Sequence, residues 1–142
     1  MNLSQALKAK KKLLKEISEL QSKIQASNSV MVGSPVYYKT RELMETLNKK
    51  VGELTSLKIS IQTANIPILG KMYEMAELKS HVQFLRRINT QEGKRLERYQ
   101  EQILEYVSDY KVDEIDQMVK EAEEKIDFLQ EEIDQFNHST HI

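Results

Sequence analysis

VDEIDQMVKEAEEKIDFLQEEIDQF, the stretch from residue 112 to residue 136, decides the fold of this chain. Its apolar residues recur at alternating spacings of three and four, and almost every residue between them is charged or an amide. This spacing is typical of a helix that buries one narrow stripe against partner helices. The stripe begins at Val112 and continues through the residues that we predict to form an oligomer seam, Ile115, Val119, Ala122, Ile126, Leu129, Ile133 and Phe136.

The same three-four rhythm recurs along the rest of the chain, which predicts an all-α fold. We expect one domain over residues 1–142, an antiparallel bundle of long helices with coiled-coil packing. A short β-like loop or hairpin is expected near residues 28–38, where β-branched residues lie on both sides of a Gly-Ser-Pro turn. The helices are expected at about residues 3–27, 39–65, 71–89, 91–107 and 112–137.

The composition agrees with a helical bundle: 142 residues, 30% charged and 39% hydrophobic, with four glycines and no tryptophan. No stretch approaches the roughly 20 apolar residues that a membrane-spanning helix needs, so we expect a cytoplasmic protein without a membrane span. The absence of cysteine excludes disulfides, thiolate nucleophiles and cysteine metal sites.

Lys10 interrupts the apolar stripe of the first helix, which otherwise contains Leu3, Ala6, Leu13 and Ile17. A charged residue at such a position commonly selects the register or the partner at some cost in stability. We therefore assign Lys10 a role in pairing specificity.

Charge is distributed unevenly along the chain. Residues 1–27 contain six lysines and two glutamates, a net charge of +4, whereas residues 112–137 contain ten acidic residues and two lysines, a net charge of −8. The first helix contains a run of lysines that we expect to be spread around it: Lys8, Lys10, Lys11, Lys12 and Lys15. The candidate anion contacts among them are Lys8, Lys11, Lys12 and Lys15. Further basic residues that could add nucleic-acid contacts are Arg86, Arg87, Lys94, Arg95 and Arg98. Solvation, or pairing with the acidic last helix, is the favoured interpretation, so nucleic-acid binding is not the primary expectation.

Three similar segments close helical stretches, and each of them ends in asparagine: Asn28, Asn65 and Asn137. Asparagine tolerates the left-handed conformation at a helix end, so the segments predict three C-terminal caps. A cluster of these polar helix ends is the alternative.

The residues that enzymatic chemistry requires are sparse. The histidines are His81, His138 and His141, and the glycines are scattered singly on a helical background. A serine or cysteine nucleophile needs a histidine held by an acid, and a phosphate-binding loop needs clustered glycines. We therefore predict no catalytic residues, no cofactor and no metal site.

Several segments of this chain resemble those of the septicolysin-like family of small bacterial helical proteins, whose members are of uncharacterised function. The resemblance spans nearly the whole chain, and it rests on Met1-Asn-Leu-Ser-Gln-Ala-Leu7, Ile24 to Asn28 followed by Gly33-Ser-Pro35, Ile61 to Asn65, and the heptads from Val112 to the closing Ile142. The family name implies a cytolysin, although no apolar hairpin long enough to span a bilayer is present in the sequence.

We therefore expect a non-enzymatic coiled-coil assembly or interaction protein, which self-associates or binds another helical protein. The alternative is an anion or nucleic-acid binding module that uses the lysine-rich first helix. A cytolysin-like activity is a third interpretation, and it is implied by the resemblance alone.

Overall fold

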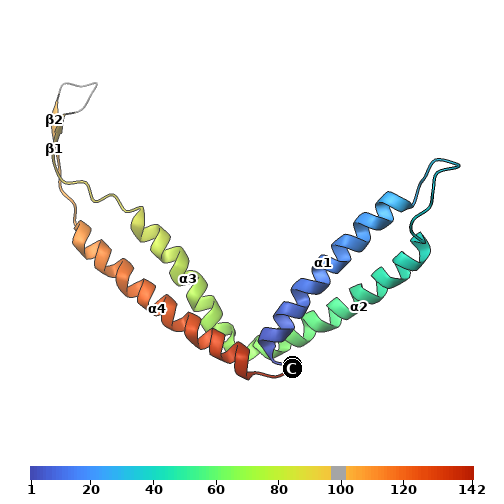
Figure 1. The fold of residues 1–142 in the computed structure, drawn as a ribbon. Helices are drawn as coiled ribbons and strands as arrows, with labels where there is room; N and C mark the ends of the chain where they lie inside the picture. Colours follow the sequence, from blue (N-terminus) through green and yellow to red (C-terminus); the bar gives the residue numbers. More distant parts are fainter. Residues whose placement is uncertain (97–101) are drawn as a thin grey trace. The chain divides into compact units, whose positions relative to one another are not determined.

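The fold is all-α apart from one small β-hairpin, as predicted for the class (Figure 1). The computed structural model describes residues 1–96 and 102–142. Within these residues the α-helices are α1 (Leu3–Ser27), α2 (Thr40–Asn65), α3 (Leu69–Arg86) and α4 (Val112–Ser139). A short 3-10 helix, η1 (Ile66–Ile68), follows α2, and the hairpin consists of β1 (Gly93–Leu96) and β2 (Ile103–Tyr106).

The chain divides into two compact units, whereas the sequence predicts one continuous bundle domain. Unit 1 contains Met1–Ile68 together with Asp134–Ile142, and unit 2 contains Leu69–Ile133. Each unit contains a pair of antiparallel helices, α1 with α2 and α3 with α4 (Figure 1). Two adjacent helices bury their apolar stripes against each other, so each pair can have a core of its own.

In unit 1, α1 and α2 pack through residues spaced alternately by three and four. We call these residues the unit 1 seam. All of them are buried or half-buried: Leu3, Ala6, Lys10, Leu13, Ile17, Leu20 and Ile24 on α1, and Leu43, Leu47, Lys50, Leu54, Leu57, Ile61 and Ala64 on α2. At the loop end of the pair, the hydroxyl groups of Ser27 and Thr40 share a hydrogen bond of 2.8 Å.

The core of unit 1 lies where the two ends of the chain meet. Leu3 and Ala6 are fully buried beside Ile61, and Phe136 from the end of α4 packs against them. The Leu3 amide donates a hydrogen bond of 2.7 Å to the Thr140 carbonyl, so the backbone also joins the two ends. Side chains of Leu7, Leu57 and Ala64 complete the cluster.

The start of α1 is capped by its own sequence. The Asn2 side chain accepts a hydrogen bond from the Gln5 amide at 2.8 Å, and the Gln5 side chain accepts one from the Asn2 amide at 2.9 Å. This reciprocal pair satisfies two amides that the first helical turn would otherwise leave without partners. The helix therefore begins at Leu3, as predicted.

In unit 2, α3 and α4 are joined by ion pairs on both sides of their apolar residues. Lys71 and Glu132 are 2.9 Å apart, and Glu74 and Lys125 are 2.7 Å apart. Arg86 forms a third pair with Glu123. The buried apolar side chains of this unit are Val82 and Leu85 on α3, and Ile115, Leu129 and Ile133 on α4.

The helix predicted over residues 91–107 is wrong, because the described part of this segment is the β1–β2 hairpin. The strands are antiparallel, with Gly93 opposite Tyr106 and Leu96 opposite Ile103. Gly93 has φ +90°, a left-handed conformation that an α-helix cannot contain. The spacing of Leu96, Ile103 and Tyr106 imitates a helical stripe, but these residue types also favour strands. Tyr99 and Arg98 lie outside the described residues.

The segment near residues 28–38 is a loop, as one form of the prediction had it, but it contains no strand and therefore no hairpin. Gly33 has φ +89°, and the Ser34 amide donates to the Met31 carbonyl at 3.0 Å in a tight turn. Pro35 has no amide to donate to a partner strand. Most of the apolar side chains of this loop are strongly exposed, including Met31, Val32 and Tyr37.

The remaining helix bounds differ from the predictions by three residues or fewer. α2 begins at Thr40 instead of residue 39, α3 spans Leu69–Arg86 instead of residues 71–89, and α4 extends to Ser139. None of the helices in the described residues combines the length and the hydropathy that crossing a membrane requires.

Candidate interaction surfaces

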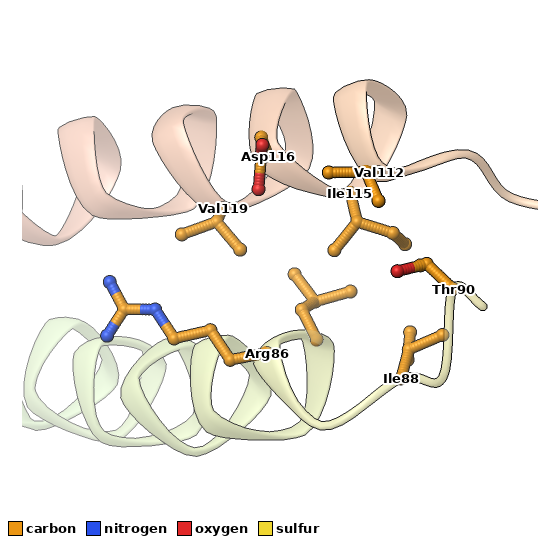
Figure 2. A pocket seen from close by; sticks show the side chains of 8 residues that line it. Arg86, Ile88, Thr90, Val112, Ile115, Asp116 and Val119 are labelled. Atoms are coloured by element: carbon orange, nitrogen blue, oxygen red, sulfur yellow. The ribbon is translucent and has the colours of Figure 1, made fainter. Parts of the chain in front are cut away.

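The predicted oligomer seam of α4 is already buried within one chain. Ile115, Leu129 and Ile133 are 6%, 4% and 7% exposed, and Val119, Ala122, Ile126 and Phe136 are half-buried. Ile115 and Val119 point toward α3 (Figure 2). The burial predicted from the spacing is thus confirmed, with α3 as a neighbour. Participation of these residues in an oligomer stays a prediction.

A pocket of about 300 Å³ lies between the end of α3 and the start of α4 (Figure 2). Its walls are mostly aliphatic, and they include Leu85, Ile88, Val112, Ile115 and Val119. Its polar residues are Arg86, Thr90 and Asp116. The pocket is therefore a gap between helices with both aliphatic and charged walls, and its lining does not contain the Ser-His-Asp type of arrangement that nucleophilic catalysis uses.

The contribution of the α4 seam can be tested with two adjacent residues of the helix, one buried and one exposed. Leu129 is 4% exposed and Phe128 is 59% exposed. We expect Leu129→Ala to lower the free energy of unfolding by about 2–5 kcal/mol, because it leaves a cavity between packed helices. Urea denaturation followed by circular dichroism measures this change.

Phe128→Ala is the matched control, and we expect it to change the free energy of unfolding by about 0.5 kcal/mol or less. Solution mass is measured on the same samples. If Leu129→Ala dissociated an oligomer and left chain stability unchanged, the residue would belong to a contact between chains instead.

A polar contact interrupts the unit 1 seam. Lys50 occupies a seam position on α2, and its Nζ lies 2.8 Å from the Glu16 carboxylate on α1. The hydrogen bond from Lys50 lowers the pKa of Glu16, and the same bond raises the pKa of Lys50. This pair was not predicted, although the three-four spacing between Leu47 and Leu54 identifies position 50 as a seam position.

The Glu16–Lys50 pair makes the stability of unit 1 dependent on pH. Because the pKa of Glu16 is lowered on folding, its contribution is present above the ordinary value of 4.5 and is lost as the pH falls through the lowered pKa. The contribution of Lys50, whose pKa is raised, is present below 10.5 and is lost as the pH rises through the raised pKa. The melting temperature of the unmodified protein should therefore fall as the pH is lowered from 6 into the acid range. We expect this fall to be smaller in Glu16→Gln, because the variant has no carboxylate at this position to protonate.

The control for this experiment is Glu19→Gln. Glu19 lies on the same helix, and its carboxylate makes a loose contact of 4.0 Å with Lys15 at the exposed surface. Thermal unfolding is followed by circular dichroism across the acid range. Equal acid sensitivity of the unmodified protein and Glu16→Gln would contradict the assignment.

Lys10 is half-buried on the unit 1 seam, which agrees with its predicted position. Its role in pairing specificity stays a prediction. Lys10 and Lys50 thus both occupy seam positions, one on each helix of the pair, and Lys50 has a carboxylate partner in Glu16.

The spread predicted for the lysines of α1 is due to Lys10, which lies on the seam, because the four candidate anion contacts share one face. Lys8, Lys11, Lys12 and Lys15 are all exposed. They recur at spacings of three and four, and at 100° per residue they share one side of the helix. That side is opposite the seam, because at 100° per residue Lys8 and Lys15 lie roughly 180° around the helix from Lys10 and Ile17. We call these four residues the lysine face.

The other predicted anion contacts do not join the lysine face into one site. Arg86 is paired with Glu123, and Arg87, Lys94 and Arg95 are exposed in unit 2. Arg98 lies outside the described residues. A separate contact lies at the base of the hairpin, where Glu92, just before β1, accepts hydrogen bonds from Lys111 and Ser108, which follow β2. The bond from Lys111 lowers the pKa of Glu92.

The three asparagines are not equivalent. Asn28 caps α1, and its amide donates to the Ile24 carbonyl at 3.0 Å, but its φ of −68° is right-handed. Asn65 is the last residue of α2, with Ile66 as the cap. Asn137 lies inside α4, which continues to Ser139. Three equivalent caps are therefore wrong. A common cluster is wrong as well, since Asn28 and Asn65 lie at opposite ends of an antiparallel pair.

Two of the histidines, His81 and His141, make local contacts. His81 stacks at 5.9 Å on Phe84 one turn away, and His141 forms a β-bridge with Asn2. In residues 1–96 and 102–142 there is no group of three or more His, Cys, Asp or Glu side chains placed to hold a metal ion.

One flank of the α1–α2 pair carries apolar side chains that the seam does not bury. Leu14, Met44 and Val51 are 43%, 43% and 44% exposed, and Leu7 is half-buried beside the core. Each of these four residues follows a seam position by one residue. We call them the apolar flank of unit 1.

The fold and these surfaces define an all-α protein built from antiparallel helix pairs. A family model matches residues 10–142, which is most of the chain. The protein belongs to this family, DUF6847, which is described as a family of unknown function. No curated protein and no solved structure matches the chain. The resemblance to septicolysin-like proteins is not tested by this family assignment.

Proposed function

We propose that this protein is a non-enzymatic, cytoplasmic assembly protein that self-associates through coiled-coil packing of its helix pairs. The observation that supports the proposal is the apolar flank of unit 1. The exposed residues there repeat with the period of the seam itself, so they form a second stripe beside the first.

The ion pairs of unit 2 show by analogy that the residues of the apolar flank lie on one side of unit 1. Arg86 follows the buried Leu85 by one residue, and Glu123 likewise follows the half-buried Ala122. These two positions contact each other across the antiparallel pair. The equivalent positions of unit 1 include Leu14 and Val51, so they lie on a common flank by the same geometry.

The opposite flank of unit 1 is polar, as are both paired flanks of unit 2. The opposite flank consists of the residues that precede every second seam position on each helix, and apart from Ala9 they are polar or charged: Ala9, Glu16, Lys23, Thr46, Glu53 and Ser60. In unit 2 the corresponding residues Glu74 and Lys125 form an ion pair. The apolar flank of unit 1 therefore differs from its counterparts in chemistry.

A second copy of the same helix pair would complete this surface. Two helices bury only one stripe each, whereas a four-helix bundle buries wider faces around one core. Two apolar flanks, one from each copy, can meet around a two-fold axis because the same residues are present on both sides. The expected product is a dimer that high salt does not dissociate, because apolar burial does not depend on charge.

We expect the double variant Leu14→Asp and Val51→Asp to be a monomer, because two carboxylates on the flank would have to be buried without partners. Light scattering after size-exclusion chromatography, at low and high salt, measures the mass. The control variant, Ala9→Asp with Ser60→Asp, adds the same charge to the opposite flank and should keep the mass of the unmodified protein.

Two results would contradict this proposal. The first is an unmodified protein that is monomeric over a wide range of concentration, which would leave the flank available for a different helical protein. The second is an oligomer that both double variants retain equally, while circular dichroism shows that their helices are intact.

An anion-binding module is the second candidate, and the lysine face favours it. Sequence-independent binding to nucleic acid neutralises phosphates and therefore weakens steeply with salt. We expect Lys8→Gln, Lys11→Gln and Lys12→Gln together to abolish any salt-sensitive binding of a duplex oligonucleotide, measured by fluorescence anisotropy. Absence of binding by the unmodified protein at low salt would dispose of this candidate.

A further inference from the structure

The lysine face of α1 has little neutralisation within its own unit. Lys12 and Lys15 lie 3.9 Å and 4.0 Å from Glu16 and Glu19, and both lysine side chains remain 79% exposed. Lys8 and Lys11 have no acidic partner within the residues that the structure describes. The face therefore presents four cations to solvent.

The outer face of α4 is its electrostatic complement. This face lies opposite the buried residues Ile115, Leu129 and Ile133, and its acidic residues are all exposed: Asp113, Glu114, Glu121, Glu124, Asp127 and Glu131. Two basic residues of α3, Lys71 and Arg86, pair with Glu132 and Glu123 on the flanks and leave this face unpaired, while Lys79 lines a hollow at its edge together with Asp127. Lys120 is a basic residue among these acids.

The two faces also match in spacing. Lys8, Lys11 and Lys15 are separated by three and four residues, and Glu124, Asp127 and Glu131 are separated by three and four residues in the same order. Because the rise per residue is the same in any α-helix, two parallel helices would bring each lysine level with one carboxylate. A shift of one heptad toward the start of α4 would instead bring Lys11 level with Lys120, so the register with Glu124, Asp127 and Glu131 is favoured.

From this complementarity we infer that the lysine face of one copy docks on the acidic outer face of α4 of a second copy. The contact is a second mode of self-association, and it does not depend on the apolar flank of unit 1. A docked polyanion fits the structure less well, because the same chain carries the larger acidic face and has a net charge of −1.

The nature of the contact decides its behaviour in solution. Exposed ion pairs are individually weak and are screened by salt, so this association should be weak and should disappear at high ionic strength. The two surfaces differ, so the contact is head-to-tail and leaves one free face of each kind on every assembly. The mean mass should therefore increase with protein concentration at low salt instead of stopping at a dimer.

Charge reversal on each face tests the inference. The first variant, Lys8→Glu with Lys11→Glu and Lys15→Glu, is acidic on both faces, and the second, Glu124→Lys with Asp127→Lys and Glu131→Lys, is basic on both. We expect each variant alone to lose the salt-sensitive increase in mass. An equimolar mixture should regain it, because the acidic faces of one variant then meet the basic faces of the other.

Sedimentation velocity at low and high salt gives the masses, and circular dichroism verifies that both variants keep their helices. Association that persists at high salt belongs to the apolar flank, and it should remain in both charge variants and be lost in the Leu14→Asp, Val51→Asp variant. The experiment can therefore contradict the salt-sensitive contact of the lysine face without contradicting the salt-resistant contact of the apolar flank, and the reverse also holds.

The inference is overturned if the unmodified protein shows no salt-sensitive increase in mass, or if the mixture of the two variants fails to associate while both are folded. It is also overturned if the first variant loses binding to a duplex oligonucleotide and the mass of the unmodified protein never depends on salt, because the lysine face would then serve a nucleic acid.

Discussion

A helix whose apolar residues repeat at three and four can bury only one narrow stripe, and the rest of this structure depends on that constraint. Each long helix must lie beside another, which produces the pairs α1–α2 and α3–α4. Within each pair the buried positions follow the repeat, from Leu3 to Ala64 in unit 1 and through Val82, Leu85 and Ile115 in unit 2. Whatever lies outside the stripes is available to solvent or to another molecule.

The two helix pairs differ in the chemistry of the residues beside their apolar stripes. In unit 2 both flanks contain ion pairs, Arg86 with Glu123 and Glu74 with Lys125. In unit 1 one flank is apolar, and the polar contact between Glu16 and Lys50 lies at the seam. A charged flank that contains ion pairs gains little from a second copy, whereas an exposed apolar flank gains by burial. For this reason the proposed oligomer contact lies on unit 1, although the most regular heptads are those of α4.

Much of the fold could be predicted because the periodic pattern is a local property. The end of α1, the burial of Ile115 and Leu129, and the position of Lys10 on a seam all follow from spacing. The segment with Leu96, Ile103 and Tyr106 was predicted incorrectly, since its spacing fits a helix while Gly93 adopts a conformation that a helix excludes. Of the two forms predicted near Gly33, the structure contains the loop and not the hairpin: the residues favour strands, but Pro35 and the tight turn leave no ladder.

By itself, the sequence determined the helical class, the main apolar stripe of each helix and the opposite charges of the two ends of the chain, because helix geometry converts spacing into faces. Only the tertiary structure decided which stripe meets which. It placed the α4 seam beside α3, brought Phe136 to Leu3 and Ala6, and left Leu14, Met44 and Val51 exposed. The physical reason is that several pairings bury similar apolar stripes, so selection among them depends on contacts between residues far apart in the chain, such as Glu16 with Lys50.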